Sequence, residues 1–134
     1  MRILDQTRLP QAEVYLELTR YQAVASAIKE LKVRGAPAIG MAGAYGIALG
    51  ALNIKAKSRR DFTAKFRQVS QTITATRPTA RNLFWAAERM GKVAARGRDI
   101  EQLKKALVRE AIKIHSEEIE ATRKLSEFGA ELIK

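Results

Sequence analysis

The chain has 134 residues, of which 46% are hydrophobic and 29% are charged, and this composition is ordinary for one globular domain with a modest core. The sequence contains no cysteine, which excludes disulfides, thiolate metal sites and a cysteine nucleophile within it. A single histidine, His115, leaves no histidine cluster for a metal.

The formal net charge is +11, a balance that can accompany nucleic-acid binding. The cations are scattered singly along helical segments, however, and no aromatic residue interleaves with the densest run, Lys55 to Arg60. We therefore expect solvated helix faces and no nucleic-acid partner. No signal-peptide pattern opens the chain, so we expect a cytoplasmic location.

Residues 1–19 are predicted to form a short β arm, in which Pro10 separates two pieces as a hairpin or as a strand with an irregular extension. The stretch "EVYLEL" has the period of a half-buried strand. Its inward positions are Val14, Leu16 and Leu18, and its outward positions are Tyr15, Glu17 and Thr19.

Residues 20–134 are predicted to be helical, because apolar residues recur there with helical spacing. The successive stripes are Tyr21, Val24, Ala25, Ile28 and Leu31; Phe62, Phe66, Val69 and Ile73; Leu83, Ala86, Ala87, Met90 and Val93; and Ile100, Leu103, Leu107, Ile114 and Ile119. Asp61 is placed as an N-cap and Gly97 as a C-cap. Trp85 and the phenylalanines lie at core spacing, and the last helix, from Asp99, continues to Lys134.

An uncharged, glycine-rich run occupies Gly35 to Ile54, long enough to span a bilayer. Its Gly and Ala content gains little from lipid, so a buried helix fits better. By helical geometry its glycines share one arc, and this predicts close approach of another backbone. These glycines are Gly40, Gly43, Gly46 and Gly50.

The start of this helix carries the features of an anion site. Pro37 suits a first turn, and the N–H groups of Gly35, Ala36 and Ala38 would then lie free at the positive end of the helix dipole. Arg34 adds a full positive charge. An ordinary helix start that binds no ligand is the competing interpretation.

The segment "TATRPTARNLFW" repeats this arrangement, because Arg77 precedes a proline and a helix that begins near Pro78. Thr79 is a natural N-cap, and Asn82 is polar in the first turn. The two arginines could converge on one anionic group through bidentate contacts. Alternatively, Arg77 is a surface cation beside a capping threonine. His115 we expect to be a packed or solvent-facing side chain rather than a catalytic one.

Four segments together resemble the N-terminal region of the methylthioribose-1-phosphate isomerase family. They are "LDQTRLP", "VRGAPAIGMAGAYGIALGA", "TRPTARNLFWAAERM" and "EAIKIHSEEIEATRKLSEFGAELI". This family is related to the regulatory subunits of the translation initiation exchange factor and to ribose-1,5-bisphosphate isomerases. The proline of "RGAPAIG" favours the methylthioribose branch, since "RGAG" is expected in the bisphosphate branch.

The resemblance implies an aldose–ketose isomerisation of 5-methylthioribose 1-phosphate to 5-methylthioribulose 1-phosphate in methionine salvage, with no metal or organic cofactor. It implies that Arg34, Gly35, Ala36 and Arg77 contact the substrate. Arg81 stands where the family has a small apolar residue, and Thr122 stands where asparagine is expected.

The resemblance also places the family's catalytic cysteine and aspartate in a Rossmann-like C-terminal domain, beyond "GAELI". We therefore expect residues 1–134 to be the helical N-terminal domain alone, either a fragment or half of a split enzyme, with no catalytic residue of its own. Its expected partners are a sugar 1-phosphate, a C-terminal catalytic domain or separate polypeptide, and further copies in a homo-oligomer. The alternative is a non-catalytic interaction module like the exchange-factor subunits.

Overall fold

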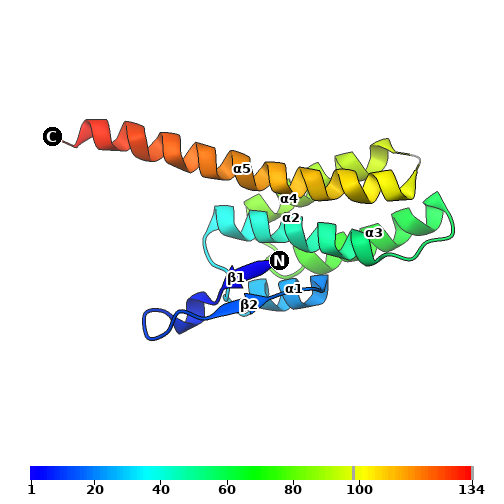
Figure 1. Ribbon diagram of the computed structural model, residues 1–134, viewed down its shortest axis with the longest axis horizontal. Coiled ribbons are helices and arrows are strands. Elements are labelled where there is room, and N and C mark those ends of the chain that lie inside the picture. Colours follow the sequence, from blue (N-terminus) through cyan, green and yellow to red (C-terminus); the bar gives the residue numbers. More distant parts are fainter. Residues whose placement is uncertain (98, 134) are drawn as a thin grey trace.

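The computed structural model describes residues 1–97 and 99–133 and folds them into a short hairpin followed by five helices (Figure 1). The hairpin consists of β1 (Arg2–Leu4) and β2 (Tyr15–Glu17), with a 3-10 helix at Gln6–Arg8 between them. The helices are α1 (Tyr21–Lys29), α2 (Ala36–Asn53), α3 (Arg59–Thr74), α4 (Arg81–Arg96) and α5 (Ile100–Leu132). The predicted class, mainly α with a β element at the start, is confirmed.

The hairpin follows the alternation of its sequence. Its strands are antiparallel, with Ile3 opposite Leu16. Leu16 is half-buried and Leu18 is buried, whereas Tyr15 is exposed. Of the two arrangements that the sequence allowed around Pro10, the structure forms the hairpin, because alternate side chains can then cover the helices.

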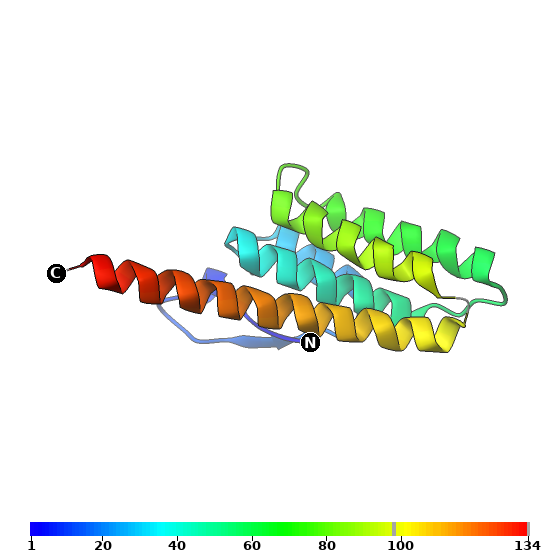
Figure 2. The ribbon, with the colours of Figure 1, turned by 90° about the horizontal axis from the view of Figure 1, so that it is seen from above.

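Helix α2 lies at the centre of the fold and packs against α1, α3, α4 and α5 (Figure 2). It is covered on all sides, and this explains why its sequence has no polar stripe. Its buried residues are Ile39, Gly40, Ala42, Gly43, Ala44, Gly46, Ile47, Ala48, Gly50 and Ala51. The buried-helix interpretation of the glycine-rich run is confirmed, and among the described residues no helix is long and apolar enough to cross a membrane.

The glycines of α2 admit neighbours of two kinds. A Cβ at Gly40 would lie 3.0 Å from the backbone oxygen of Asn82 in α4, so the predicted backbone approach is confirmed at this position. At Gly43, Gly46 and Gly50 the prediction is wrong, since the closest atoms there belong to side chains. These are the side chains of Leu83, Ile73 and Val69, respectively. The glycines of α2 therefore make room for side chains of α3 and α4 and for one close backbone contact.

The outer helices bury most of the predicted stripes. In α3, for example, Phe62, Phe66, Val69 and Ile73 are all buried. The N-cap of this helix is Ser58 and not Asp61, whose own N–H donates to the Ser58 hydroxyl at 3.1 Å. Asp61 lies in the first turn, and its carboxylate accepts a hydrogen bond from Lys65 at 2.9 Å. A serine three residues earlier reaches the free N–H groups better than an aspartate already inside the helix.

Several aromatic and aliphatic positions predicted to be internal are exposed. Phe84 and Trp85 are each 44% exposed, since α4 turns Leu83 and Ala86 toward the core instead. Ile119 is 57% exposed and Phe128 is 66% exposed. The two views agree that the last part of α5 extends past the other helices (Figures 1 and 2).

The chain also differs from expectation just after α1 and at the C-terminal end of α5. Leu31 follows the end of α1 with a φ of 60° and is 42% exposed, because the turn after the helix points it outward. Gly97 caps the end of α4, and Asp99 caps the start of α5 by accepting a 2.7 Å hydrogen bond from the N–H of Gln102. The predicted continuation of the last helix is wrong at Ile133, which is the C-cap of α5 in an extended conformation, and Lys134 lies outside the described residues.

Candidate functional site

The first turn of α2 presents an open helix start. Gly35 is the N-cap with a φ of 91°, a backbone conformation that favours glycine, and no side chain of the described residues caps the helix there. Pro37 lies in the first turn, as predicted. Arg34, Gly35 and Ala36 are all exposed. The N–H groups at this start thus face solvent at the positive end of the helix dipole.

The hairpin arm orients Arg34. One guanidinium nitrogen of Arg34 donates to the backbone carbonyl of Gln6 at 2.6 Å, and the Gln6 N–H donates to the carbonyl of Lys32 at 3.0 Å. The guanidinium is thereby held beside the helix start, with further N–H groups still free to bind an anion. Sequence reasoning missed Gln6, whose contribution is a backbone atom that no residue pattern marks.

Asp5 organises the turn that carries Gln6. Its carboxylate accepts hydrogen bonds from the Thr7 hydroxyl at 2.6 Å and from the Thr7 N–H at 3.0 Å. The hydroxyl contact lowers the pKa of Asp5 below its ordinary value. Burial opposes this shift, and the Thr7 N–H contact and nearby cations add to it. The charged form of Asp5 therefore stabilises the folded arm.

The start of α4 differs from its prediction. Helix α4 begins at Arg81 with Ala80 as N-cap and has no side-chain cap, so Thr79 is not the capping residue. Thr79 lies in a turn that the Ala80 N–H closes by donating to the carbonyl of Arg77 at 3.0 Å. The N-cap therefore lies one residue later than predicted, at Ala80. Arg81 is then the exposed first residue of α4.

The two helix starts lie side by side. Figure 2 shows α2 and α4 running in the same direction, with both N-terminal ends at the same end of the bundle. The contact between Gly40 and Asn82 joins the second turn of α2 to the first turn of α4. The fold thus brings the segments of Arg34 and Arg77 to one end of the molecule, with Arg77 half-buried and Arg34 exposed.

The predicted residues do not share one enclosed cavity. A hollow of about 560 Å³ lies beside the start of α4, with Pro78, Thr79, Arg81 and Asn82 among its lining. Another, of about 420 Å³, lies between the hairpin, α2 and α5 and includes Gln6 and Ala38. The helix starts form an open surface flanked by these two hollows, which leaves room for a second molecule or domain to close over a ligand.

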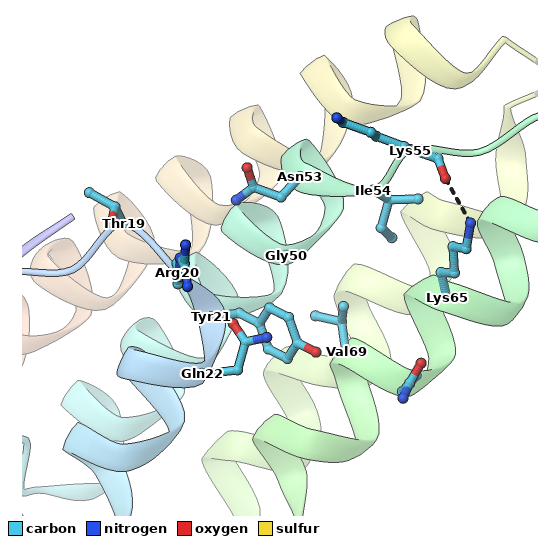
Figure 3. A pocket seen from close by; sticks show the side chains of 11 residues that line it. Thr19, Arg20, Tyr21, Gln22, Gly50, Asn53, Ile54, Lys55, Lys65 and Val69 are labelled. Atoms are coloured by element: carbon cyan, nitrogen blue, oxygen red, sulfur yellow. Dashed lines mark hydrogen bonds between the residues drawn. The ribbon is translucent and has the colours of Figure 1, made fainter.

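A larger hollow, of about 730 Å³, lies elsewhere (Figure 3). It is bounded by the start of α1, the end of α2 and the middle of α3, with Arg20, Asn53 and Lys65 in its lining. The Lys65 ammonium there donates to the carbonyl of Lys55 at 2.7 Å. The end of α2 presents carbonyl groups and negative partial charge, the opposite of its start.

His115 is a packed residue. Its Nδ1 lies 3.0 Å from the Tyr45 hydroxyl, and the two rings meet edge to face at 5.7 Å between centroids, so the pair joins α2 to α5. Burial raises the pKa of Tyr45 above its ordinary value. No group of three or more His, Asp or Glu residues in the described part of the chain could hold a metal ion.

Comparisons with solved structures define the class of domain. The structure of 5-methylthioribose 1-phosphate isomerase from Pyrococcus horikoshii matches with a TM-score of 0.92 and 38% identity, over 98% of this chain and 37% of that one. The delta subunit of translation initiation factor eIF-2B from A. fulgidus matches with a TM-score of 0.90 and 40% identity, over 99% of this chain and 39% of that one. The fold is the helical domain that these two proteins share.

Sequence comparisons identify the family. The model of the Initiation factor 2 subunit family matches residues 32–134, and the chain belongs to this family. Among curated relatives, the methylthioribose-1-phosphate isomerase of Dehalococcoides mccartyi is 62% identical over 132 residues, which are 98% of this chain and 40% of that protein. The isomerase of Geobacter sulfurreducens is 47% identical over 98% of this chain and 38% of its own length. The chain thus spans about two fifths of the relatives that it matches.

Proposed function

We propose that this chain is the sugar-phosphate-binding part of an aldose–ketose isomerase that converts 5-methylthioribose 1-phosphate to 5-methylthioribulose 1-phosphate in the cytoplasm. The observation that carries the proposal is the 62% identity, across both helix starts, to a relative named methylthioribose-1-phosphate isomerase. The adjacent starts of α2 and α4 supply the matching chemistry, because neither has a side-chain cap among the described residues and each follows an arginine in the chain, Arg34 or Arg77.

The substrate phosphate would bind at the start of α2. The N–H groups of Gly35 and Ala36 would donate to phosphate oxygens, and the absence of a side chain on Gly35 lets the phosphate approach the backbone closely. Arg34 and Arg77 would add charge-assisted hydrogen bonds from two sides. The contact of Arg34 with the Gln6 carbonyl fixes the guanidinium beforehand and so lowers the entropy lost on binding.

The proton transfers would come from a catalytic unit that carries the family's cysteine and aspartate, in the same polypeptide or a separate one. This chain has no cysteine, so it would hold the substrate and the partner would move protons between C1 and C2. The exposed position of Arg34, Gly35 and Ala36 suits a site completed by a second body. The whole of residues 1–134 would then act as one N-terminal helical domain.

A titration of the chain with inorganic phosphate and with 5-methylthioribose 1-phosphate tests the site. We expect Arg34→Ala and Arg77→Ala each to weaken binding by about tenfold or more, the effect of losing one charge-assisted contact. The matched control is Arg109→Ala, which removes an exposed arginine from the first third of α5 and should change affinity by less than about twofold, the effect of one distant screened charge. Equal affinity in all four proteins would overturn the phosphate site. No isomerase turnover is expected from the chain alone.

A non-catalytic interaction module is the second candidate. The 40% identity and TM-score of 0.90 to the delta subunit of eIF-2B favour it, because that protein carries the same domain under a different name. The same titration separates the two candidates. Saturable phosphate binding that depends on Arg34 and Arg77 supports the isomerase proposal, and a chain that binds neither phosphate nor the sugar phosphate supports the interaction module.

A further inference from the structure

The hollow of about 730 Å³ at the end of α2 has the size of a small-molecule site (Figure 3). Three cations line it, one from each surrounding element, and its lining among the described residues contains no carboxylate. Arg20 precedes α1, Lys55 follows α2 and Lys65 lies in α3. Because the walls of a hollow focus the field of such charges, this place attracts anions more strongly than an open surface with the same charges.

Two of these cations have a role in the folded chain itself. The Lys65 ammonium donates to the Asp61 carboxylate at 2.9 Å and to the Lys55 carbonyl at 2.7 Å. Lys55 lies two residues beyond the end of α2, where the negative end of the helix dipole favours a cation. Both charges therefore stabilise the fold, and neither by itself indicates a ligand.

Arg20 has the opposite relation to its helix. It is the N-cap of α1, a position that favours Ser, Thr, Asn or Asp, and no side chain of the described residues caps this helix. Its charge lies at the positive end of the helix dipole, with no acidic residue in the first turn. None of the ion pairs among the described residues involves Arg20. A residue that opposes local preferences in this way is typical of a functional site, because a bound anion would offset the cost.

The hollow also has an apolar wall. Figure 3 shows the ring of Tyr21 reaching from α1 toward Val69 of α3, with Gly50 of α2 beside them. Tyr21 is half-buried, so the core holds its ring on one side while the other side lines the hollow. An aromatic ring beside cations is a surface on which a flat ring with attached anionic groups can pack. The lining also contains three side-chain amides, which belong to Gln22, Asn53 and Gln68.

We propose that this hollow binds a nucleoside phosphate. Its phosphate groups form charge-assisted hydrogen bonds with Arg20 and Lys55, and its base packs on Tyr21. The exposed amides of Gln22 and Gln68 supply donors and acceptors for the edge of a base. Neither Arg20 nor Lys55 pairs with a carboxylate of the described residues, and two such cations favour a ligand with at least two negative charges, such as a nucleoside diphosphate.

This hollow and the proposed phosphate site lie at opposite ends of α2. The helix has 18 residues, so its two ends are about 27 Å apart at a rise of about 1.5 Å per residue. This separation exceeds the Debye length at physiological ionic strength. The two sites can therefore be occupied independently of each other.

Calorimetric titration of the chain with ADP, pyrophosphate and adenosine tests the proposal. We expect ADP to bind at least about tenfold more tightly than either of the other two, because only ADP engages the cations and the aromatic wall together. Pyrophosphate that binds as tightly as ADP would show attraction to the charges alone and would overturn the assignment to a nucleoside phosphate. Absence of ADP binding also overturns it.

Variants of the lining locate the site. Arg20→Gln should weaken ADP binding by about tenfold or more, and Tyr21→Leu by about fivefold or more, because leucine keeps the apolar packing and loses the stacking surface. The matched control is Arg67→Gln, which removes the same charge from α3 where it lines a separate hollow toward α4, and it should change affinity by less than about twofold. Equal loss in Arg20→Gln and Arg67→Gln overturns the proposal, since it would indicate non-specific attraction to a basic surface.

A serine at the same position separates binding from folding. Arg20→Ser supplies a capping side chain and removes the charge from the positive end of α1, so it should raise the midpoint of thermal unfolding while it weakens ADP binding. Unchanged ADP affinity in this variant overturns the proposal.

The phosphate site at the start of α2 is separated by Arg34→Ala. This variant should bind ADP as the native chain does, whatever its affinity for inorganic phosphate. Loss of ADP binding in Arg34→Ala would place the nucleotide at the start of α2 and overturn the site in this hollow. Loss of inorganic phosphate binding alone leaves the nucleotide site intact.

Discussion

The two ends of the glycine-rich segment use the same residue for different physical reasons. Gly35 has a φ of 91°, and a Cβ added to it would meet no atom within 4 Å. Gly50 lies inside α2, and a Cβ there would overlap the branched side chain of Val69. The first glycine is required by backbone conformation and the second by lack of space.

This difference separates the proposed binding surface from the packed helix that supports it. At the open start of α2, no atom of the described residues lies within 4 Å of a Cβ added to Gly35. The remainder of the helix is held so closely by α3 and α4 that its first turn has a fixed position relative to Asn82 and the start of α4. Substitutions at the two ends should therefore have different signatures in stability and in binding.

The largest effect is expected at the packed end. Gly50→Ala forces a methyl group against both Cγ atoms of Val69, which is branched at Cβ and cannot rotate away freely. We expect a loss of about 2 kcal/mol in the free energy of unfolding, in the range for overpacked cores, measured by urea denaturation. Unchanged or increased stability would show that the packing around Gly50 is looser than the structure describes.

A smaller loss of stability, joined to a loss of binding, is expected at the open end. Gly35→Ala places a side chain at a positive φ, and the strain should lower the free energy of unfolding by about 1 kcal/mol. Phosphate affinity should fall as well, since the strained turn displaces the N–H groups of Gly35 and Ala36. If stability falls and phosphate affinity does not, the start of α2 is not the phosphate site.

The smallest effect has the opposite sign and provides the control for both. Gly91 lies inside α4, and an added Cβ would meet no atom within 4 Å. Gly91→Ala should stabilise the protein by about 0.5–1 kcal/mol, because alanine loses less backbone entropy in a helix. Thermal unfolding should show a higher midpoint with phosphate affinity unchanged. A loss of stability would contradict the distinction between free and packed helical glycines.

Sequence periodicity predicted much of the fold because the core-facing stripes of α1, α3 and α4 repeat with the helical period. It was wrong at Phe84 and Trp85, whose hydrophobicity suggested burial although the neighbouring Leu83 and Ala86 already fill the space beneath α4. It was also wrong at Ile119, because the pattern of a helix does not say where the bundle beside it ends.

The sequence predicted part of the candidate site, as it predicted part of the fold. Proline, glycine and arginine have local preferences at helix starts, so the residue pattern alone was enough to place Arg34, Gly35 and Ala36 at the beginning of α2. The cap at Thr79 could not be placed correctly, because a turn closed by the carbonyl of Arg77 competes with a capping side chain. The anchoring of Arg34 by the Gln6 carbonyl depends on the hairpin and left no local signal.

The sequence by itself determined the helical class, the alternation in the hairpin and the burial of the glycine-rich helix. It also indicated the family of the chain. These features depend on local preference and on patterns within single segments. Only the tertiary structure decided that the starts of α2 and α4 lie together, which glycines meet backbone or side chain, and where α5 leaves the bundle. Those features depend on contacts between segments far apart in the chain, whose geometry is set by how complementary surfaces pack.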